Sequence, residues 1–280
     1  MYKREKNIKV LIIWRGPSPY RVDFFNELGK LCDLTVLFER RPDQITDKEK
    51  SWFHEDFTHF KGIYLKSITF RNTAFSLEQF KYLRKNAEYD YIVIGMYSTF
   101  IQMSSLLYLK LFKIPYLLNS DGGFIKKENK ITYYIKRFFI SGAKAYLSSS
   151  KGTSKYLQYY GANNKIMVYP FTTSFQKDVY KNLTAEDKLK YKKILGIKYN
   201  VIILFSGQFI YRKGVDILLK AAKNISKQCG IYIVGGEPTR EYLSLCKENN
   251  LNNVHFIGFT PPQDLAQYYK IGRASCRERV

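Results

Sequence analysis

The chain has 280 residues, 45% of them hydrophobic, which is enough for one large domain or two ordinary ones with a sizeable core. Its 46 lysines and arginines against 24 aspartates and glutamates give a net charge of +22, which favours an anionic partner such as nucleic acid, lipid headgroups or phosphates. The cysteines show no metal-ligand or C-x-x-C spacing, and neither a secretory segment nor a run of about 18 apolar residues is found. These features predict a reduced, cytoplasmic protein without a metal site, for which any membrane contact would be peripheral.

Short apolar runs alternate with helical stretches along the first part of the chain. The runs cover residues 8–14, 34–38, 91–95, 116–119, 145–148 and 166–169. After the first run, apolar residues recur every three positions at Val22, Phe25, Leu28 and Leu31, which predicts an amphipathic helix over residues 20–31. Ser18 and Pro19 supply the N-cap and first-turn signals for this helix. This alternation predicts a parallel α/β sheet over residues 1–170.

The pattern lapses and then starts again in the second part of the chain. Residues 171–199 are polar and rich in lysine, which predicts a linker with one helix. Strands are then expected at 201–205, 231–234 and 254–257, with helices at 215–225, 239–249 and 262–269. Three strands are too few to cover both faces of a doubly wound sheet, so we expect the domain at residues 200–270 to be incomplete.

The last ten residues differ in composition from the rest. Residues 271–280 hold three of the 13 arginines, and IGRASCRERV resembles the in-frame translation of a short-read sequencing adapter. We therefore expect the natural sequence to stop at Lys270 and residues 271–280 to be a non-native tail. The alternative is an ordinary basic C-terminus.

The most informative segment is SGQFIYRKG, residues 206–214, between a predicted strand and a predicted helix. A helix N-terminus carries partial positive charge, so Arg212 and Lys213 are mildly repelled there unless an anion lies between them. Phosphate would satisfy both the backbone and the two side chains. The alternative is that both side chains extend into solvent.

This segment resembles the start of the donor domain in family 4 glycosyltransferases of the GT-B type, whose pattern is G-R-x-x-x-x-K-G. Gly207, Lys213 and Gly214 match this pattern, whereas Gln208 stands at the position of the arginine. The resemblance implies that Gly207 and Lys213 bind the diphosphate of a sugar nucleotide. Arg212 is a plausible substitute for the missing arginine.

Two later segments carry the same resemblance. Gly235 and Gly236 resemble the family's second glycine turn, where the backbone approaches the nucleotide; the alternative is a simple tight turn. Residues 253–259 follow the family's nV-x-F-x-G strand, in which His255 is expected to be structural.

The first domain is expected to hold the acceptor side of the site. Asp121, Gly122 and Gly123 follow a central strand, and ligands of open α/β sheets bind at such ends. Family members often have an active-site histidine near this position, so the resemblance implies that Asp121 faces the transferred sugar or the acceptor hydroxyl. A turn-forming Asp-Gly is the alternative.

The loop after the first strand also resembles the acceptor side of the family. Gly16, Tyr20 and Arg21 belong to it, and the loop lacks the G-x-G-x-x-G pattern of dinucleotide sites. Arg21 is expected either to meet an anionic acceptor group or to cap the surface.

Residues 131–141 mix aromatic and basic side chains on a predicted helix. Such a helix can lie at a membrane interface. We favour the alternative, in which the aromatic residues belong to the core and the cations are solvated.

The resemblance implies two Rossmann-like domains of the GT-B type, the second incomplete, that transfer a sugar from a nucleoside diphosphate sugar to an acceptor hydroxyl. The acceptor would be a carbohydrate or lipid-linked molecule of polysaccharide, lipopolysaccharide or glycolipid synthesis. The reaction would be retaining, with no metal and no cofactor besides the donor substrate. The family's E-x(7)-E segment would lie beyond Lys270, so this chain should have little activity.

Two other classes of protein compete with this interpretation. A basic α/β protein that binds nucleic acid would fit the charge of +22, but the lysines are spread along the chain and do not cluster, so we expect no nucleic-acid partner. A nucleotide-dependent epimerase or dehydrogenase would need the G-x-G-x-x-G that follows neither opening strand.

Overall fold

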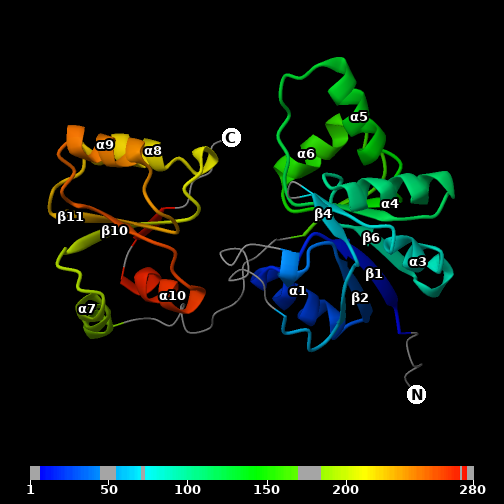
Figure 1. Cartoon of the computed structure of the whole chain (residues 1–280), viewed down its shortest axis with the longest axis horizontal. Coiled ribbons are helices and arrows are strands. Elements are labelled where there is room, and N and C mark those ends of the chain that lie inside the picture. The colour runs from blue at the N-terminus through cyan, green and yellow to red at the C-terminus, as the bar shows by residue number, and fades with distance from the viewer. Residues whose placement is uncertain (1–6, 45–54, 71–72, 170–183, 272, 276–280) are drawn as a thin grey trace. The chain divides into compact units, whose positions relative to one another are not determined.

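The computed structural model describes residues 7–44, 55–70, 73–169, 184–271 and 273–275, and the chain divides into two compact units, residues 1–174 and 175–280 (Figure 1). We call them the N-terminal unit and the C-terminal unit. The elements of the N-terminal unit are β1 (Lys9–Trp14), α1 (Pro19–Gly29), β2 (Asp33–Phe38), η1 (Pro42–Gln44), β3 (Lys61–Tyr64), β4 (Ile68–Phe70), β5 (Thr73–Phe75), α3 (Gln79–Leu83), η2 (Asn86–Glu88), β6 (Tyr91–Ile94), α4 (Phe100–Leu111), β7 (Leu117–Ser120), α5 (Lys130–Ile140), β8 (Ala145–Ser148), α6 (Lys151–Tyr159) and β9 (Ile166–Val168). Those of the C-terminal unit are α7 (Ala185–Ile194), β10 (Val201–Ser206), η3 (Tyr211–Lys213), α8 (Val215–Ala222), β11 (Cys229–Val234), α9 (Arg240–Glu248), β12 (Val254–Ile257), α10 (Pro262–Ile271) and β13 (Arg273–Ser275).

The N-terminal unit is built on a parallel sheet with the strand order β3-β2-β1-β6-β7-β8-β9. Along the chain the strands first proceed outward from β1 through β2 to β3, and then restart on the other side of β1 with β6. In a doubly wound sheet the ligand crevice lies outside the carboxyl ends of the strands at this reversal. The sheet therefore predicts a site beside the carboxyl ends of β1 and β6.

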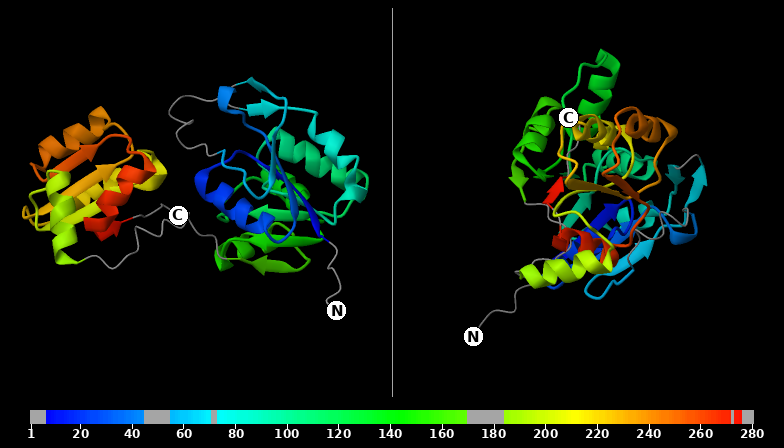
Figure 2. Two further views of the ribbon diagram at one scale, coloured as in Figure 1. Left: turned by 90° about the horizontal axis from the view of Figure 1, so that it is seen from below. Right: turned by 90° about the vertical axis from the view of Figure 1, so that its left-hand side faces the viewer.

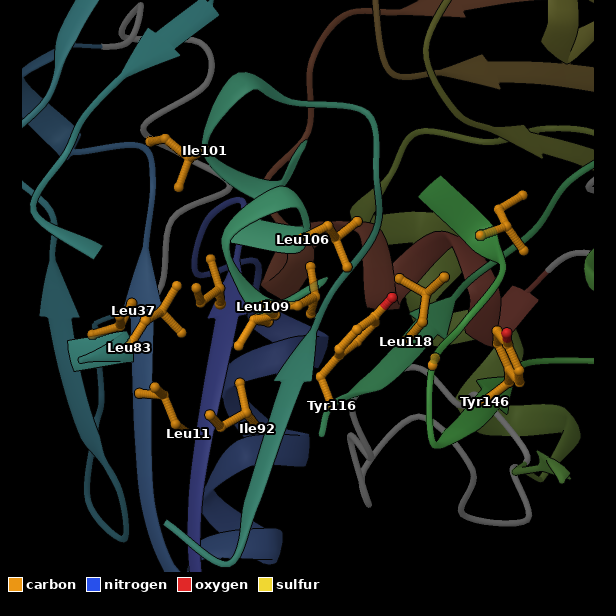
Figure 3. Packing of buried hydrophobic residues seen from close by; sticks show 14 of the residues in the cluster. Leu11, Leu37, Leu83, Ile92, Ile101, Leu106, Leu109, Tyr116, Leu118 and Tyr146 are labelled. Carbon is orange, nitrogen blue, oxygen red and sulfur yellow. The ribbon is translucent and has the colours of Figure 1, made fainter. Parts of the chain in front are cut away.

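Alternating side chains of β1 supply the cores on the two faces of this sheet. Leu11 and Ile13 point to the face covered by α3, α4, α5 and α6, where the largest buried cluster of the unit lies (Figure 3). Val10, Ile12 and Trp14 point to the opposite face and pack with residues of α1. A strand that is apolar on both faces is what a covered parallel sheet requires.

The amphipathic helix expected at residues 20–31 is present as α1. It begins with Pro19 in its first turn, and Ser18 occupies the N-cap with an extended backbone, although no hydrogen bond forms from its side chain. Val22 and Phe25 are buried as the pattern predicts. Leu31 lies beyond the helix and is exposed, because the chain turns there into β2.

The C-terminal unit has three layers around a parallel sheet of order β12-β11-β10-β13. Helices α8 and α9 pack on one face, and α7 and α10 pack on the other (Figures 1 and 2). Three strands were expected here, but the described residues contain four. The additional strand, β13, falls within the predicted tail and pairs with β10 from Ile203↔Arg273 to Phe205↔Ser275, because an open sheet edge offers unpaired N–H and C=O groups to any extended segment.

Part of the segment expected to be a linker belongs to the C-terminal unit. The expected helix is α7, which opens with a capping box between Thr184 and Asp187. It packs against α10, and the following Ile197 is buried in the core of the unit. The earlier part of the expected linker, residues 171–183, lies outside the described residues.

Helix α5 differs from its favoured interpretation. Ile140 is its buried residue, whereas Ile131, Tyr134, Ile135 and Phe138 are between 47% and 73% exposed. The expectation that the aromatic side chains of this helix fill the core is therefore wrong for Tyr134 and Phe138. The reason is that α5 contacts the core through a narrow stripe that contains Tyr133 and Phe139.

No helix in the described part of the chain is both long enough and apolar enough to cross a bilayer.

Candidate functional site

An ion pair between a buried arginine and a half-buried aspartate lies at the carboxyl edge of the N-terminal sheet. Arg21 on α1 is 1% exposed, and its Nη2 lies 2.5 Å from Oδ2 of Asp121, which follows β7. The guanidinium also lies over the ring of Trp14, 4.2 Å from the centroid, at the end of β1. The fold thus joins two residues that are 100 positions apart in the sequence, and Arg21 is a buried partner of Asp121 and not a cap on the surface.

Two further residues hold this pair in place. The Asn119 side-chain amide donates to Oδ1 of Asp121 at 3.0 Å and to the carbonyl of Gly95 at 3.2 Å. The Tyr169 hydroxyl donates to Oδ1 of Asn119 at 2.6 Å and accepts from Nη1 of Arg21 at 3.4 Å. Burial raises the pKa of Tyr169, and the nearby Arg21 charge opposes that shift. Each oxygen of Asp121 therefore has a partner, which orients the carboxylate.

The roles of Asn119 and Tyr169 were not anticipated from the sequence. Neither Asn119 nor Tyr169 was among the expected site residues, although both lie where an apolar run ends. Position at a strand end was the available signal, but it does not show which side chains meet across several strands.

The expected glycines of this edge have different environments. The Gly122 carbonyl accepts from Ser120 Oγ at 2.9 Å, and a side chain at Gly122 would meet open space. A Cβ at Gly123 would lie 2.5 Å from the ring of Tyr156, so this position packs against α6. The Gly16 carbonyl accepts a hydrogen bond from the backbone N–H of Ser18 in the turn before α1, and Tyr20 is half-buried on that helix.

A buried carboxyl group that the sequence did not single out lies on the same edge. Glu39 follows β2, is 1% exposed, and accepts a hydrogen bond from Thr99 Oγ1 at 2.9 Å. Burial raises its pKa to about 7, against the opposing effects of hydrogen bonds from Thr99 and Gln102 and of the charges of Arg15 and Arg40. Thr99 also caps α4 by accepting from the Gln102 backbone N–H, which connects the carboxyl group to the start of that helix.

The expected donor loops lie together at the carboxyl edge of the C-terminal sheet. Gly207 follows β10 and donates to the Val234 carbonyl at 3.0 Å, and Gly235 follows β11 with φ +121°. A Cβ at Gly235 would lie 2.4 Å from the Gly207 carbonyl oxygen, whereas one at Gly236 would press on the ring of Phe209 at 3.1 Å. Close packing within the chain thus requires glycine at position 235 and leaves little room for a side chain at position 236.

The basic residues of the first donor loop lie at the start of α8. Arg212 and Lys213 form the end of η3, and Gly214 with φ +72° connects this turn to α8. The Lys213 stem passes beside Gly207, because its Cδ is 3.9 Å from the place where a Cβ of Gly207 would be. Arg212 is exposed and Lys213 is half-buried. A positively charged side chain thus lies next to a glycine loop and a helix N-terminus, a combination suited to an anion.

His255 on β12 has structural partners, as expected. Its ring stacks on Tyr232 with a centroid distance of 4.8 Å, and its Nε2 lies 3.3 Å from the Tyr199 hydroxyl. Burial lowers its pKa. Among the described residues, no group of three or more His, Cys, Asp or Glu side chains could hold a metal ion.

Comparison with known proteins identifies the C-terminal segment. Residues 187–277 match the family model described as glycosyl transferases group 1. This match lies within the C-terminal unit and covers about a third of the chain. A stretch of 94 residues is also 31% identical to an uncharacterised glycosyltransferase of Methanocaldococcus jannaschii, over 32% of this chain and 24% of that protein. The chain therefore spans about a quarter of the curated relative that it matches.

Solved structures show the fold around this group 1 segment. The chain is similar to Anabaena HepE in complex with UDP and glucose, with a TM-score of 0.69 and 16% identity over 97% of this chain and 74% of that one. It is also similar to WaaG, a glycosyltransferase involved in lipopolysaccharide biosynthesis, with a TM-score of 0.62 and 15% identity over 94% and 73%. A glycosyltransferase from Rickettsia africae gives a TM-score of 0.64 at 18% identity over 95% and 72%. The expected GT-B fold with two Rossmann-like domains is confirmed.

Proposed function

We propose that the chain is part of a retaining glycosyltransferase that moves a sugar from a nucleoside diphosphate sugar to an acceptor hydroxyl. The observation that supports it best is the loop of residues 206–214 within the group 1 segment, where Lys213 lies beside Gly207 at the start of α8. The HepE structures hold UDP with glucose and UDP-glucose, which makes a uridine diphosphate sugar the first donor to test.

In this proposal the C-terminal unit binds the donor. Lys213, assisted by Arg212, neutralises the charge that develops on the departing diphosphate, and the N–H groups at the start of α8 add partial positive charge. Gly207, Gly235 and Gly236 keep the strand ends free of side chains, so that backbone can approach the nucleotide.

The N-terminal unit positions the acceptor. Asp121 has each oxygen held by a partner, Arg21 or Asn119, and its side chain remains 28% exposed. A carboxylate fixed in this way is suited to accept a hydrogen bond from a sugar or acceptor hydroxyl. Gly16, Gly122 and Gly123 in the loops on the same edge, and Tyr20 in the first turn of α1, shape the acceptor side. Arg21 acts through Asp121 and is a positioning residue.

The acceptor is proposed to be a carbohydrate or a lipid-linked molecule of polysaccharide, lipopolysaccharide or glycolipid synthesis. Involvement of WaaG, a structural relative, in lipopolysaccharide biosynthesis supports this class. The proposed mechanism needs no metal and no cofactor besides the donor.

Donor binding tests the proposal directly. We expect isothermal titration calorimetry with UDP to detect binding by the full chain, and Lys213→Ala to weaken the affinity about tenfold, because a charged hydrogen bond contributes about 1.5 kcal/mol or more. Lys223→Ala, at the other end of α8, is the matched control and should leave the Kd unchanged. Equal loss in both variants would indicate nonspecific charge attraction and contradict the assignment of Lys213. Tighter, salt-dependent binding of single-stranded DNA than of UDP would favour a nucleic-acid-binding protein.

A further inference from the structure

The outer surface of α5 combines exposed apolar side chains at helical spacing. Ile131, Tyr134, Ile135 and Phe138 follow the i, i+3, i+4, i+7 pattern, with exposed fractions of 73%, 64%, 50% and 47%. This spacing places them on one side of the helix, and that side faces away from the core. Such a stripe normally packs against another element, so its exposure marks an interaction surface.

The loop before α5 extends the apolar surface and adds positive charge. Phe124 and Ile125 are about half exposed, and Lys126, Lys127 and Lys130 follow within five positions. We call the α5 surface the set formed by Phe124, Ile125, Lys126, Lys127, Lys130, Ile131, Tyr134, Ile135 and Phe138.

The charge of this region is not balanced by acidic residues. Residues 91–160 contain ten lysines and arginines but two acidic residues, Asp121 and Glu128. Asp121 pairs with buried Arg21, and Glu128 accepts hydrogen bonds from Lys136 and Tyr160. Both carboxylates are thus used within the fold, and the α5 surface presents a net positive field.

A hollow lies on this surface beside the apolar stripe. Its volume is about 380 Å³, and its lining consists of Lys126, Lys127, Glu128, Lys130, Tyr133, Tyr134 and Tyr159. The Glu128 carboxylate in this lining already accepts from Lys136 and Tyr160, so the three lysines outnumber it. Ammonium and phenol groups are donors that suit a phosphate-bearing headgroup. Tyr134 belongs to both the hollow and the stripe, so the polar and apolar parts are continuous.

From this arrangement we propose that the α5 surface docks on an anionic phospholipid membrane. The stripe would enter the boundary between headgroups and acyl chains, while the lysines would pair with lipid phosphates. A nucleic acid would supply phosphates but no apolar phase for Ile131 and Ile135. Helix α4 contacts α5 and is tied to its C-terminal end by Lys110, and α4 itself carries the exposed Leu107 and Leu111 (Figure 1).

This inference does not rest on the proposed transfer reaction, because docking needs no donor. The test is flotation of the full chain with vesicles of phosphatidylcholine alone and of phosphatidylcholine with 30% phosphatidylglycerol, a composition we choose for the experiment. We expect binding to the anionic vesicles that weakens with salt, and little binding to the neutral ones.

Two variants with matched controls separate the contributions of charge and apolar insertion. The triple variant Lys126→Glu, Lys127→Glu, Lys130→Glu should lower the partition coefficient by roughly a hundredfold. The control triple variant changes three exposed lysines of α7, Lys188→Glu, Lys190→Glu and Lys193→Glu, and should lower it far less. Ile131→Ser with Ile135→Ser should lower it about tenfold or more, and Leu189→Ser with Leu243→Ser is the control. Circular dichroism, together with urea unfolding followed by the fluorescence of Trp14 in the core of the N-terminal unit, verifies that each variant is folded.

Several outcomes would overturn the inference. It fails if the α5 variants and their controls bind anionic vesicles equally, or if the wild type binds neutral and anionic vesicles alike. It also fails if sedimentation without vesicles shows a dimer that the Ile131→Ser, Ile135→Ser variant abolishes, because the α5 surface would then be an interface between copies. Loss of UDP binding with intact vesicle binding would contradict the proposed function alone.

Discussion

The buried carboxyl group of Glu39 makes a quantitative prediction about stability and pH. Burial raises its pKa from the ordinary 4.5 to about 7 in the folded chain. The folded state therefore holds this proton more tightly than the unfolded state does. Consequently the contribution of Glu39 to stability is most favourable below pH 4.5, declines as pH rises from 4.5 to about 7, and changes little above that.

The magnitude follows from the size of the shift. A difference of about 2.5 pH units at about 1.4 kcal/mol per unit amounts to roughly 3 kcal/mol of unfolding free energy lost between pH 4.5 and pH 8. Glu39→Gln keeps the shape and an oxygen that can accept from Thr99, but it cannot ionise. We expect the variant to match the wild type near pH 4.5 and to be more stable by up to about 3 kcal/mol at pH 8.

The assay is urea unfolding followed by tryptophan fluorescence at several pH values. Trp14 lies in the core of the N-terminal unit and reports on the part that contains Glu39. Glu88→Gln, at an exposed carboxylate paired with Lys85, is the control and should shift stability by less than about 0.5 kcal/mol at every pH. A stability difference between Glu39→Gln and wild type that stays constant from pH 4.5 to 8 would refute the argument.

Two further predictions concern the edges of the two sheets. Asp121→Asn should destabilise the N-terminal unit by about 3 kcal/mol, because it leaves the buried Arg21 charge without its counter-ion. The double variant Arg21→Met, Asp121→Asn should recover part of this loss. Urea unfolding of the single and double variants measures both effects, and no recovery would contradict the coupling. Gly235→Ala should lower the stability of the C-terminal unit by about 3 kcal/mol, because the Cβ would meet the Gly207 carbonyl and φ is +121°. Gly196→Ala is the control: its φ is +64° and the space around it is open, so the loss should be about 1 kcal/mol. Equal losses in thermal unfolding would show that steric contact does not decide the effect at Gly235.

Local sequence pattern was sufficient for most of the architecture. The strands at β8 and β12 have the bounds predicted, and α1, α8 and α9 lie within three residues of theirs, because each has an apolar period that one element type satisfies. The short strands β3, β4 and β5 were not predicted, since most of their side chains are exposed or half-buried and they form no buried apolar run. The strand β13 was missed because its pairing depends on the open edge of β10.

The sequence by itself determined the α/β class, the two β–α series and the loops that carry Asp121, Gly207, Lys213 and Gly235, because residue type and spacing are local properties. Tertiary structure alone decided which of these side chains meet. Only the strand order brings Arg21, Asn119, Asp121 and Tyr169 into one network, and only packing reveals that Glu39 is buried while the stripe of α5 is exposed. Burial depends on what the rest of the chain covers, and an amphipathic pattern is the same whether its apolar side meets a core or a membrane.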